Sequence, residues 1–209
     1  MCRMFMWGWL DKHRVGNANR LRRNHSKEKF MKRTFIGVVS SLLLASSAWA
    51  FELSSPDVAE GKVLSAAQVG NNFGCTGGNL SPALNWKNAP AGTRSFAVTV
   101  YDPDAPTGSG WWHWLAYDIP ATATGLPAAT VVKAALPAGT KQGRNDGGAR
   151  AFGGACPPPG DKPHHYIFTV HALKVDKLEV PEEASAALIG FMLHATGLAT
   201  AKITSTYSR

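Results

Sequence analysis

A set of polar side chains able to bind anions or transfer protons lies near the predicted ends of strands and in a glycine-rich segment. Its members are Asp102, Asp104, His113, Arg144, Asp146, His164, His165 and Tyr166. Imidazole, phenol and the N–H groups of glycine-rich loops are hydrogen-bond donors suited to phosphate oxygens. Histidine with aspartate can also bind a metal or act as an acid–base pair. These residue types therefore leave three kinds of site open: a small-anion site, a metal site assembled across strands, and a catalytic pair.

The sequence lacks the common motifs of catalysis and metal binding. It has no G-x-S-x-G and no H-E-x-x-H, which argues against a serine hydrolase and a zinc metalloprotease. Neither H-x-x-x-H nor C-x-x-C occurs, and we expect no metal ion and no cofactor. Asp102 and Asp104 have an alternative role as turn residues that make local side-chain hydrogen bonds. His171, in the middle of a predicted strand, is interpreted as structural or exposed.

Strands must position most of this polar set. Alternating or aromatic-rich segments predict strands over residues 81–86, 94–101, 111–119, 166–173 and 202–207. Residues 121–163 predict a long loop region, of a kind that is usually functional. A helix is predicted over residues 181–199, with Pro181, Glu182 and Glu183 in its first turn and Gly197 at its end. Its predicted buried face consists of Leu188, Ile189, Met192 and Thr196. The predicted class is mostly β, with one or two peripheral helices.

Strand alternation predicts which polar residues share a face, because side chains two residues apart point to the same side of a sheet. His164 shares a face with Tyr166 if the strand extends back to both. Asp102 continues the face of Phe96, Val98 and Val100. His113 is expected on the face that carries Trp111, Leu115 and Tyr117.

The first 50 residues predict a targeting segment. Residues 31–34 are basic, residues 35–47 are apolar or small, and Ala48-Trp49-Ala50 is an A-x-A site. This order predicts a signal peptide over residues 31–50 that is cleaved after Ala50. Residues 1–30 fit the pattern poorly and are interpreted as an over-extended reading frame, the alternative being an unusually long basic region. We therefore expect a periplasmic or secreted protein with a single domain over residues 51–209.

The basic charge of the chain belongs mostly to this leader. The full sequence has 22 Lys and Arg against 14 Asp and Glu, whereas residues 51–209 carry twelve of each. A nucleic-acid-binding domain would be expected to carry its own basic excess, so we expect no nucleic-acid partner. No apolar run reaches the roughly 18 residues of a membrane-spanning helix, so no integral membrane segment is expected after cleavage.

Two cysteines remain after the predicted cleavage, Cys75 and Cys156. An even count in an exported protein favours a disulfide between them, and two free buried thiols are the alternative. The bond would close a loop of roughly 80 residues and stabilise the fold by about 4 kcal/mol in the chain-entropy description.

Several segments of the predicted mature chain follow one another in a recognisable order. They are D-P-D-A-P (102–106), G-S-G-W-W-H-W-L-A-Y-D-I-P (108–120) and G-G-A-C-P-P-P-G-D-K-P-H-H-Y-I-F-T-V-H-A-L (153–173). This series resembles the phosphatidylethanolamine-binding protein family. G-G-N-L-S-P-A-L-N-W (77–86) and G-R-N-D (143–146) are similar to its bacterial, Raf-kinase-inhibitor-like branch. The resemblance runs from about residue 51 to residue 207, and the leader and cysteine pair suggest an exported member.

The resemblance implies a central β-sandwich with a few peripheral helices and a small pocket for phosphoryl or other anionic headgroups. By motif match, the lining of this pocket falls on Asp102, His113, Pro157, Pro158, His164 and Tyr166. Asp104, Arg144 and Asp146 are further candidates. Trp111 and Trp112 stand where the family often has Glu or His, which bears on the polarity of the rim.

We therefore predict an exported binding module with a regulatory or inhibitory role. His113, His164 and Tyr166 are expected to donate to an anionic oxygen, and Asp102 to orient a histidine or a cationic headgroup. Binding should weaken as the pH rises through the titration range of histidine. Two alternatives stay open: a hydrolase that uses the His/Asp pocket, and a protein inhibitor whose pocket is vestigial and whose partner is a protein target.

Overall fold

The computed structural model describes residues 49–129 and 136–209. Residues 1–30 and all but the last two residues of the predicted signal peptide lie outside this range. The described strands and helix are, in chain order, β1 (Glu52–Ser54), β2 (Leu84–Lys87), β3 (Ser95–Asp102), β4 (Trp111–Pro120), β5 (Gly125–Leu126), β6 (Lys141–Gln142), β7 (His164–Leu173), α1 (Ala186–Thr196) and β8 (Gly197–Tyr207). No helix in these two stretches is long and apolar enough to cross a membrane.

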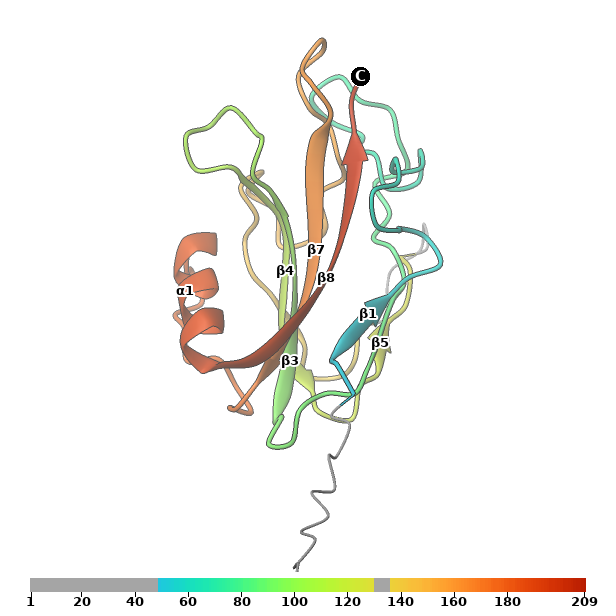
Figure 1. The fold of residues 1–209 in the computed structure, drawn as a ribbon. Helices are drawn as coiled ribbons and strands as arrows, with labels where there is room; N and C mark the ends of the chain where they lie inside the picture. The colour runs from blue at the N-terminus through green and yellow to red at the C-terminus, as the bar shows by residue number, and fades with distance from the viewer. Residues whose placement is uncertain (1–48, 130–135) are drawn as a thin grey trace, which may run out of the picture. The chain divides into compact units, whose positions relative to one another are not determined.

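Two antiparallel sheets pack around the main core. The larger has the strand order β6-β4-β3-β7-β8 and the smaller the order β1-β2-β5. Large side chains from both sheets meet between them, among them Leu84, Trp86, Phe96, Trp114 and Phe168. In Figure 1, β1 and β5 lie on one side of the large sheet and α1 lies on the other. The predicted mostly-β sandwich is confirmed, with one helix in the described residues.

The middle strand β3 is buried on both faces because each face has a cover. Phe96, Val98 and Val100 face the small sheet, as the alternation predicts. Ala97 faces the opposite way and packs in a second apolar cluster that includes Ile189 of α1. The helix therefore buries the face of the large sheet that the small sheet does not cover.

The helix is shorter than predicted. It begins after Ser185, whose side chain caps it by accepting a hydrogen bond from the N–H of Leu188 at 3.2 Å, so Pro181, Glu182 and Glu183 precede it. A serine side chain at this position satisfies a backbone donor that proline and glutamate further back do not reach. Gly197 ends the helix as predicted, but the chain continues directly into β8.

The buried face of the helix also differs from the prediction. Ala186, Ile189 and Leu193 are buried, whereas Leu188 is 38% exposed. The contacts with the large sheet decide this face, since Ile189 and Leu193 pack with Leu115 and other residues of the second cluster. Residues 121–163 also depart from a pure loop, because they include the short strands β5 and β6.

A β-bulge in β4 changes the face on which His113 lies. Val100 pairs with Trp114 and Tyr101 pairs with Trp112, so His113 is an extra residue on its strand. Leu115 and Tyr117 pack on the helix side, whereas the His113 ring lies 5.2 Å from the ring of Tyr166, on the other side. The predicted common face of His113, Leu115 and Tyr117 is therefore wrong. A bulge re-aims side chains because it breaks the two-residue period of the strand.

Candidate functional site

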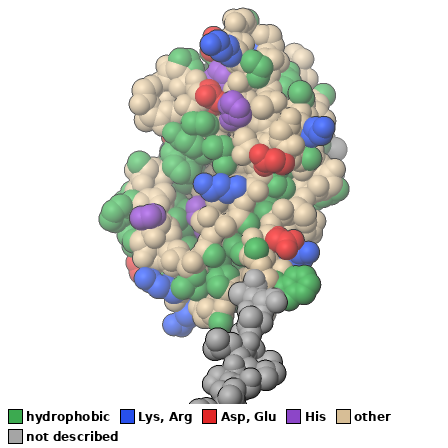
Figure 2. Space-filling view, viewed as in Figure 1, with side chains coloured by type: hydrophobic (Ala, Val, Ile, Leu, Met, Phe, Trp, Pro, Cys, Tyr) green, Lys and Arg blue, Asp and Glu red, His purple; other side chains and the backbone are tan. Residues whose placement is uncertain are grey.

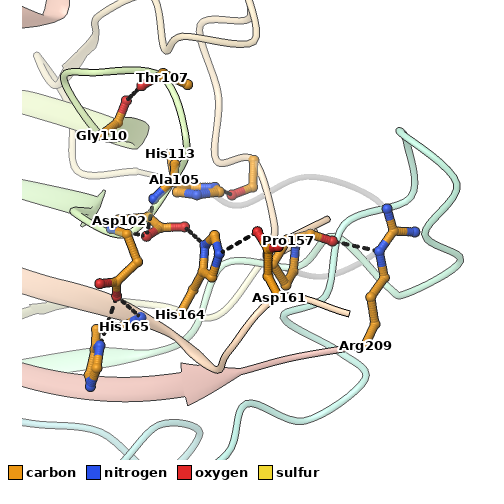
Figure 3. Close-up of polar contacts among 12 residues, drawn as sticks. Asp102, Ala105, Thr107, Gly110, His113, Pro157, Asp161, His164, His165 and Arg209 are labelled. Atoms are coloured by element: carbon orange, nitrogen blue, oxygen red, sulfur yellow. Dashed lines mark hydrogen bonds and ion pairs between the residues drawn. The ribbon is translucent and has the colours of Figure 1, made fainter. Parts of the chain in front are cut away.

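A cavity of about 450 Å³ opens where the end of β3 meets the beginnings of β4 and β7. Six residues singled out from the sequence all line it: Asp102, His113, Pro157, Pro158, His164 and Tyr166. Figure 3 shows Asp102, His113 and His164 close together, with Pro157 and Arg209 beyond them. Figure 2 shows histidine and acidic side chains side by side near the top of the molecule, the end at which β7 begins in Figure 1.

Asp102 and His164 form a buried pair at the floor of the cavity. The Asp102 Oδ1 atom accepts hydrogen bonds from the N–H groups of Asp104 and Ala105, at 2.8 and 3.1 Å. Its Oδ2 atom lies 2.8 Å from Nδ1 of His164, and Nε2 of His164 lies 3.3 Å from Oδ2 of Asp161. Asp102 is therefore both a turn residue and a partner of histidine, two roles that the sequence left as alternatives.

The charge of His164 follows from these contacts. Burial alone would disfavour the charged ring, but the hydrogen bonds and charges of Asp102 and Asp161 raise the pKa of His164 above its ordinary value. Both ring nitrogens meet carboxylates, which differs from the expectation that His164 donates to a ligand. The ring instead ties two carboxylates together beneath the cavity.

His113 is held in place by the backbone segment that contains Gly153. Its Nδ1 atom lies 2.8 Å from the carbonyl oxygen of Gly153, and the N–H of Gly153 donates back to the carbonyl of His113 at 2.9 Å. Burial lowers the pKa of His113 even though Gly153, Asp102 and Asp146 act in the opposite direction. The ring is therefore mostly neutral near pH 7.

Glycine is required beside this contact. A Cβ atom at position 154 would lie 2.5 Å from the backbone nitrogen of Gly70, which real Cβ atoms do not tolerate. Gly154 also donates its N–H to Oδ1 of Asn79 at 2.7 Å. This close approach of two loops places the carbonyl of Gly153 against His113.

Tyr166 brings a hydroxyl group to the cavity without a partner for it. The side chain is 1% exposed, and its hydroxyl has no hydrogen bond to any described residue. Burial, the charge of Asp102 and the nearness of its side chain raise the pKa of Tyr166 well above its ordinary value, so the hydroxyl keeps its proton, although the two groups do not have hydrogen-bond geometry. It is a donor available to whatever enters the cavity.

The three further candidates do not line the cavity. Asp104 is exposed and accepts from Nδ1 of His165 at 2.7 Å, and its pKa is lowered because the contacts with His165 outweigh partial burial. Arg144 forms an ion pair with Glu183 at 2.9 Å. Asp146 accepts from the N–H of Trp112 at 2.8 Å. All three fix loops around the site.

Several lining residues were not singled out as binding residues from the sequence. Asn79 and Phe73 come from the glycine-rich loop over residues 71–79, Trp111 from the start of β4, and Arg209 from the residues after β8. Phe73 is 68% exposed and meets Trp111 edge to face, with ring centroids 6.4 Å apart. Arg209 donates to the carbonyls of Pro157 and Phe73, at 2.5 and 3.1 Å. These residues give the cavity an apolar rim with one cationic side chain.

The disulfide predicted from the cysteine count is present and joins two walls of the cavity. Cys75 and Cys156 are bonded, with Cα atoms 5.9 Å apart. Cys156 lines the cavity beside Pro157, and Cys75 follows the rim residue Phe73 by two positions. Within residues 49–129 and 136–209, no group of three His, Cys, Asp or Glu side chains is arranged to hold a metal ion.

Comparison with known proteins agrees with this architecture. Residues 54–208 match the family model described as phosphatidylethanolamine-binding protein. YbcL of Escherichia coli strain K12 is 54% identical over 172 residues, covering 81% of this chain and 94% of YbcL. YbhB of the same strain is 48% identical over 160 residues, covering 75% of this chain and 99% of YbhB. LppC of Mycobacterium tuberculosis strain H37Rv, named as a candidate lipoprotein, is 36% identical over 141 residues, covering 68% of this chain and 64% of LppC.

A solved structure is similar over the same region. The crystal structure of Escherichia coli YbcL superposes with a TM-score of 0.73 at 55% sequence identity, covering 76% of this chain and 98% of YbcL. That structure is described as a new member of the mammalian PEBP family.

Proposed function

The chain belongs to the phosphatidylethanolamine-binding protein family, and on this premise we propose that it is an exported binding protein for a small anionic ligand that carries a phosphoryl group. The Tyr166 hydroxyl is the single observation that carries the proposal. It is buried, belongs to the cavity lining and has no partner among the described residues. An unpaired buried hydroxyl costs about 1–3 kcal/mol, and a ligand oxygen would recover that cost.

The arrangement beneath the hydroxyl supports a preformed site. Asp102 is 2% exposed and His164 is 3% exposed, and each has its polar atoms paired within the protein. Paired, buried groups hold their geometry before a ligand arrives, which reduces the entropy lost on binding. The apolar rim of Phe73 and Trp111 would contact an organic group attached to the phosphoryl end.

Export is supported by observations at three places. The A-x-A site ends at Ala50, and the next residue, Phe51, already packs against the core, with its ring 6.2 Å from that of Phe96. The disulfide suits an oxidising compartment. LppC, one of the relatives, is named as a candidate lipoprotein, a class that is exported. Cell fractionation followed by N-terminal sequencing should find the processed protein outside the cytoplasm and beginning at Phe51. Retention in the cytoplasm would contradict the proposal.

An NMR titration of the processed protein with inorganic phosphate and O-phosphoethanolamine tests the binding function. We expect saturable shifts at the His113 ring, and a roughly tenfold weaker affinity in Tyr166→Phe, because a hydrogen bond to a charged oxygen contributes about 1.5–3 kcal/mol. Tyr117→Phe is the matched control, since Tyr117 lies on the helix side of the sheet. Unchanged affinity in Tyr166→Phe, or equal losses in the two variants, would contradict the assignment.

A further inference from the structure

We propose that the cavity selects phosphomonoesters over phosphodiesters, because His113 presents a hydrogen-bond acceptor that a terminal P–OH group satisfies and a diester does not. This inference rests on the proposed function of the same cavity. It decides between two sources of a phosphoryl group, a free monoester and the diester headgroup of an intact phospholipid.

The tautomer of His113 follows from one contact. A backbone carbonyl only accepts hydrogen bonds, so the ring nitrogen 2.8 Å from the Gly153 oxygen, Nδ1, must carry the hydrogen. In the neutral ring the other nitrogen, Nε2, then has a lone pair and no hydrogen. Nε2 has no hydrogen bond to any described residue, and the ring lines the cavity. The cavity floor therefore offers an acceptor at this point.

The ring is set up to stay neutral until a ligand arrives. His113 is 7% exposed, and burial lowers its pKa. The charges of two carboxylates act in the opposite direction and raise the pKa: Asp102 of β3 and Asp146 of the loop after β6. The other ionisable groups at the cavity are His164 and Tyr166 from β7, with Asp161 on the far side of His164 and Arg209 at the rim.

No other cation at the floor replaces a proton on His113. His164 is bracketed by Asp102 and Asp161, so its charge is already matched by two carboxylates. The Arg209 guanidinium is held at the rim by the carbonyls of Pro157 and Phe73. An oxyanion at the floor would therefore meet the Tyr166 donor on one side and the Nε2 lone pair on the other. A hydrogen between Nε2 and the oxyanion removes this conflict.

A phosphomonoester can supply that hydrogen and a diester cannot. The second pKa of a phosphomonoester is about 6, so its monoanion with one P–OH is accessible near neutral pH. The P–OH would donate to Nε2 of His113, and a second phosphoryl oxygen would accept from the Tyr166 hydroxyl. Above pH 6 the free monoester is mainly a dianion, so binding takes up one proton from solution. A diester has no P–OH, and its binding requires protonation of His113 itself.

Isothermal titration calorimetry with two probes tests this inference. O-phosphoethanolamine is a monoester and glycerophosphoethanolamine is a diester with the same ammonium group. We expect the diester to bind at least tenfold more weakly at pH 7, since a difference of about 1.4 kcal/mol corresponds to a factor of ten. The monoester affinity should fall about tenfold per pH unit between pH 7 and 8, as expected for uptake of one proton. Titrations in two buffers with different ionisation enthalpies measure that proton directly.

A second measurement keeps the test independent of folding defects. ¹⁵N NMR of the wild-type imidazoles should find His113 as the neutral Nδ1–H tautomer before ligand is added, and an imidazolium or the Nε2–H form there would overturn the inference. His113→Gln adds an amide N–H that can donate to an oxyanion, so both the preference for the monoester and the pH dependence of its binding should become smaller. His171→Gln is the matched control, because His171 does not line the cavity.

The outcomes distinguish a failure of monoester selection from a failure of phosphoryl binding. Equal affinities for the two probes without proton uptake would overturn the selection of monoesters and leave a phosphoryl-binding protein. No binding of either probe would overturn the proposed function and, with it, this inference.

Discussion

Two buried aspartates at opposite ends of the β3–β4 pair show what separates a site from a structural contact. Asp102, which pairs with Trp111, is 2% exposed, and Asp118, next to the Ile119 that pairs with Phe96, is 7% exposed. Each accepts from the backbone and pairs with a basic side chain. Asp118 accepts from the N–H of Leu178 at 2.7 Å and lies 3.2 Å from Nζ of Lys141.

The two environments differ in what surrounds the carboxylate. Asp102 shares its neighbourhood with a cavity, a neutral histidine and an unpaired tyrosine hydroxyl. Asp118 fastens the segment around Leu178 to β4, and it does not line the cavity. Burial and charge pairing are therefore common to both ends. Groups left unpaired beside an open volume are what mark the Asp102 end as the site.

Removal of the disulfide at the cavity end should cause the largest loss of stability. In Cys75→Ala/Cys156→Ala we expect the free energy of unfolding to fall by about 4 kcal/mol, because the closed loop spans 81 positions in the sequence. Phosphate affinity should fall as well, because the disulfide joins the Phe73 wall to the Pro157 wall. Urea unfolding measures the first effect, and wild type treated with reductant is the control. A loss below about 1 kcal/mol would contradict the chain-entropy argument.

Removing charge from each aspartate compares the two ends directly. Asp102→Asn should cost about 3 kcal/mol, because breaking a buried ion pair leaves His164 without its main partner. Asp118→Asn should cost about 1 kcal/mol, because the amide oxygen still accepts from Leu178 and Lys141 is largely exposed.

Ligand titration makes this comparison sharper than stability alone. Asp102→Asn should weaken phosphate binding, whereas Asp118→Asn should leave it unchanged. Loss of binding in both variants would mean that the Asp118 end also supports the site.

Two histidines on β7, His164 and His171, should have opposite effects on how stability depends on pH. The raised pKa of His164 means that its stabilising contribution is complete below about pH 6.5 and is lost as the pH rises through that raised value. Burial, with a smaller effect of Lys202, lowers the pKa of His171 to about 4. The unfolded chain then binds a proton that the folded protein does not, so stability falls as the pH falls from about 6.5 towards 4.

His171→Gln tests the predicted loss of stability at acidic pH. Between pH 7 and pH 5 we expect wild type to lose about 2 kcal/mol more unfolding free energy than the variant, from the cost of keeping His171 neutral. Urea unfolding at the two pH values measures it. Parallel losses in the two proteins would show that other groups dominate acid destabilisation.

The sequence allowed much of the fold and part of the site to be predicted, for identifiable reasons. His164 and Tyr166 lie on one face of β7 because their two-residue spacing is undisturbed. The face of His113 could not be predicted in this way. The bulge in β4 depends on the pairing of β4 with β3, which the periodicity of a single strand does not reveal. Asp161 and Arg209 reach the site through loop and end-of-strand geometry, which depends on contacts distant in sequence. The helix start at Ser185 was missed because proline and glutamate upstream carry similar first-turn signals.

The bulge at His113 also limits how this protein can vary over time. A substitution in β4 leaves the register of the strand intact, even though most of its side chains are buried. Deletion of either codon between Trp111 and Trp114 would instead remove this bulge, because Val100 and Tyr101 would then pair with consecutive residues of β4. Loss of His113 would leave Trp111 and Trp112 on their present faces. Loss of Trp112 would place His113 opposite Tyr101 and turn it towards the helix cluster, so either deletion would remove the imidazole from the cavity. In this short stretch the site depends on the number of residues as well as on their identities.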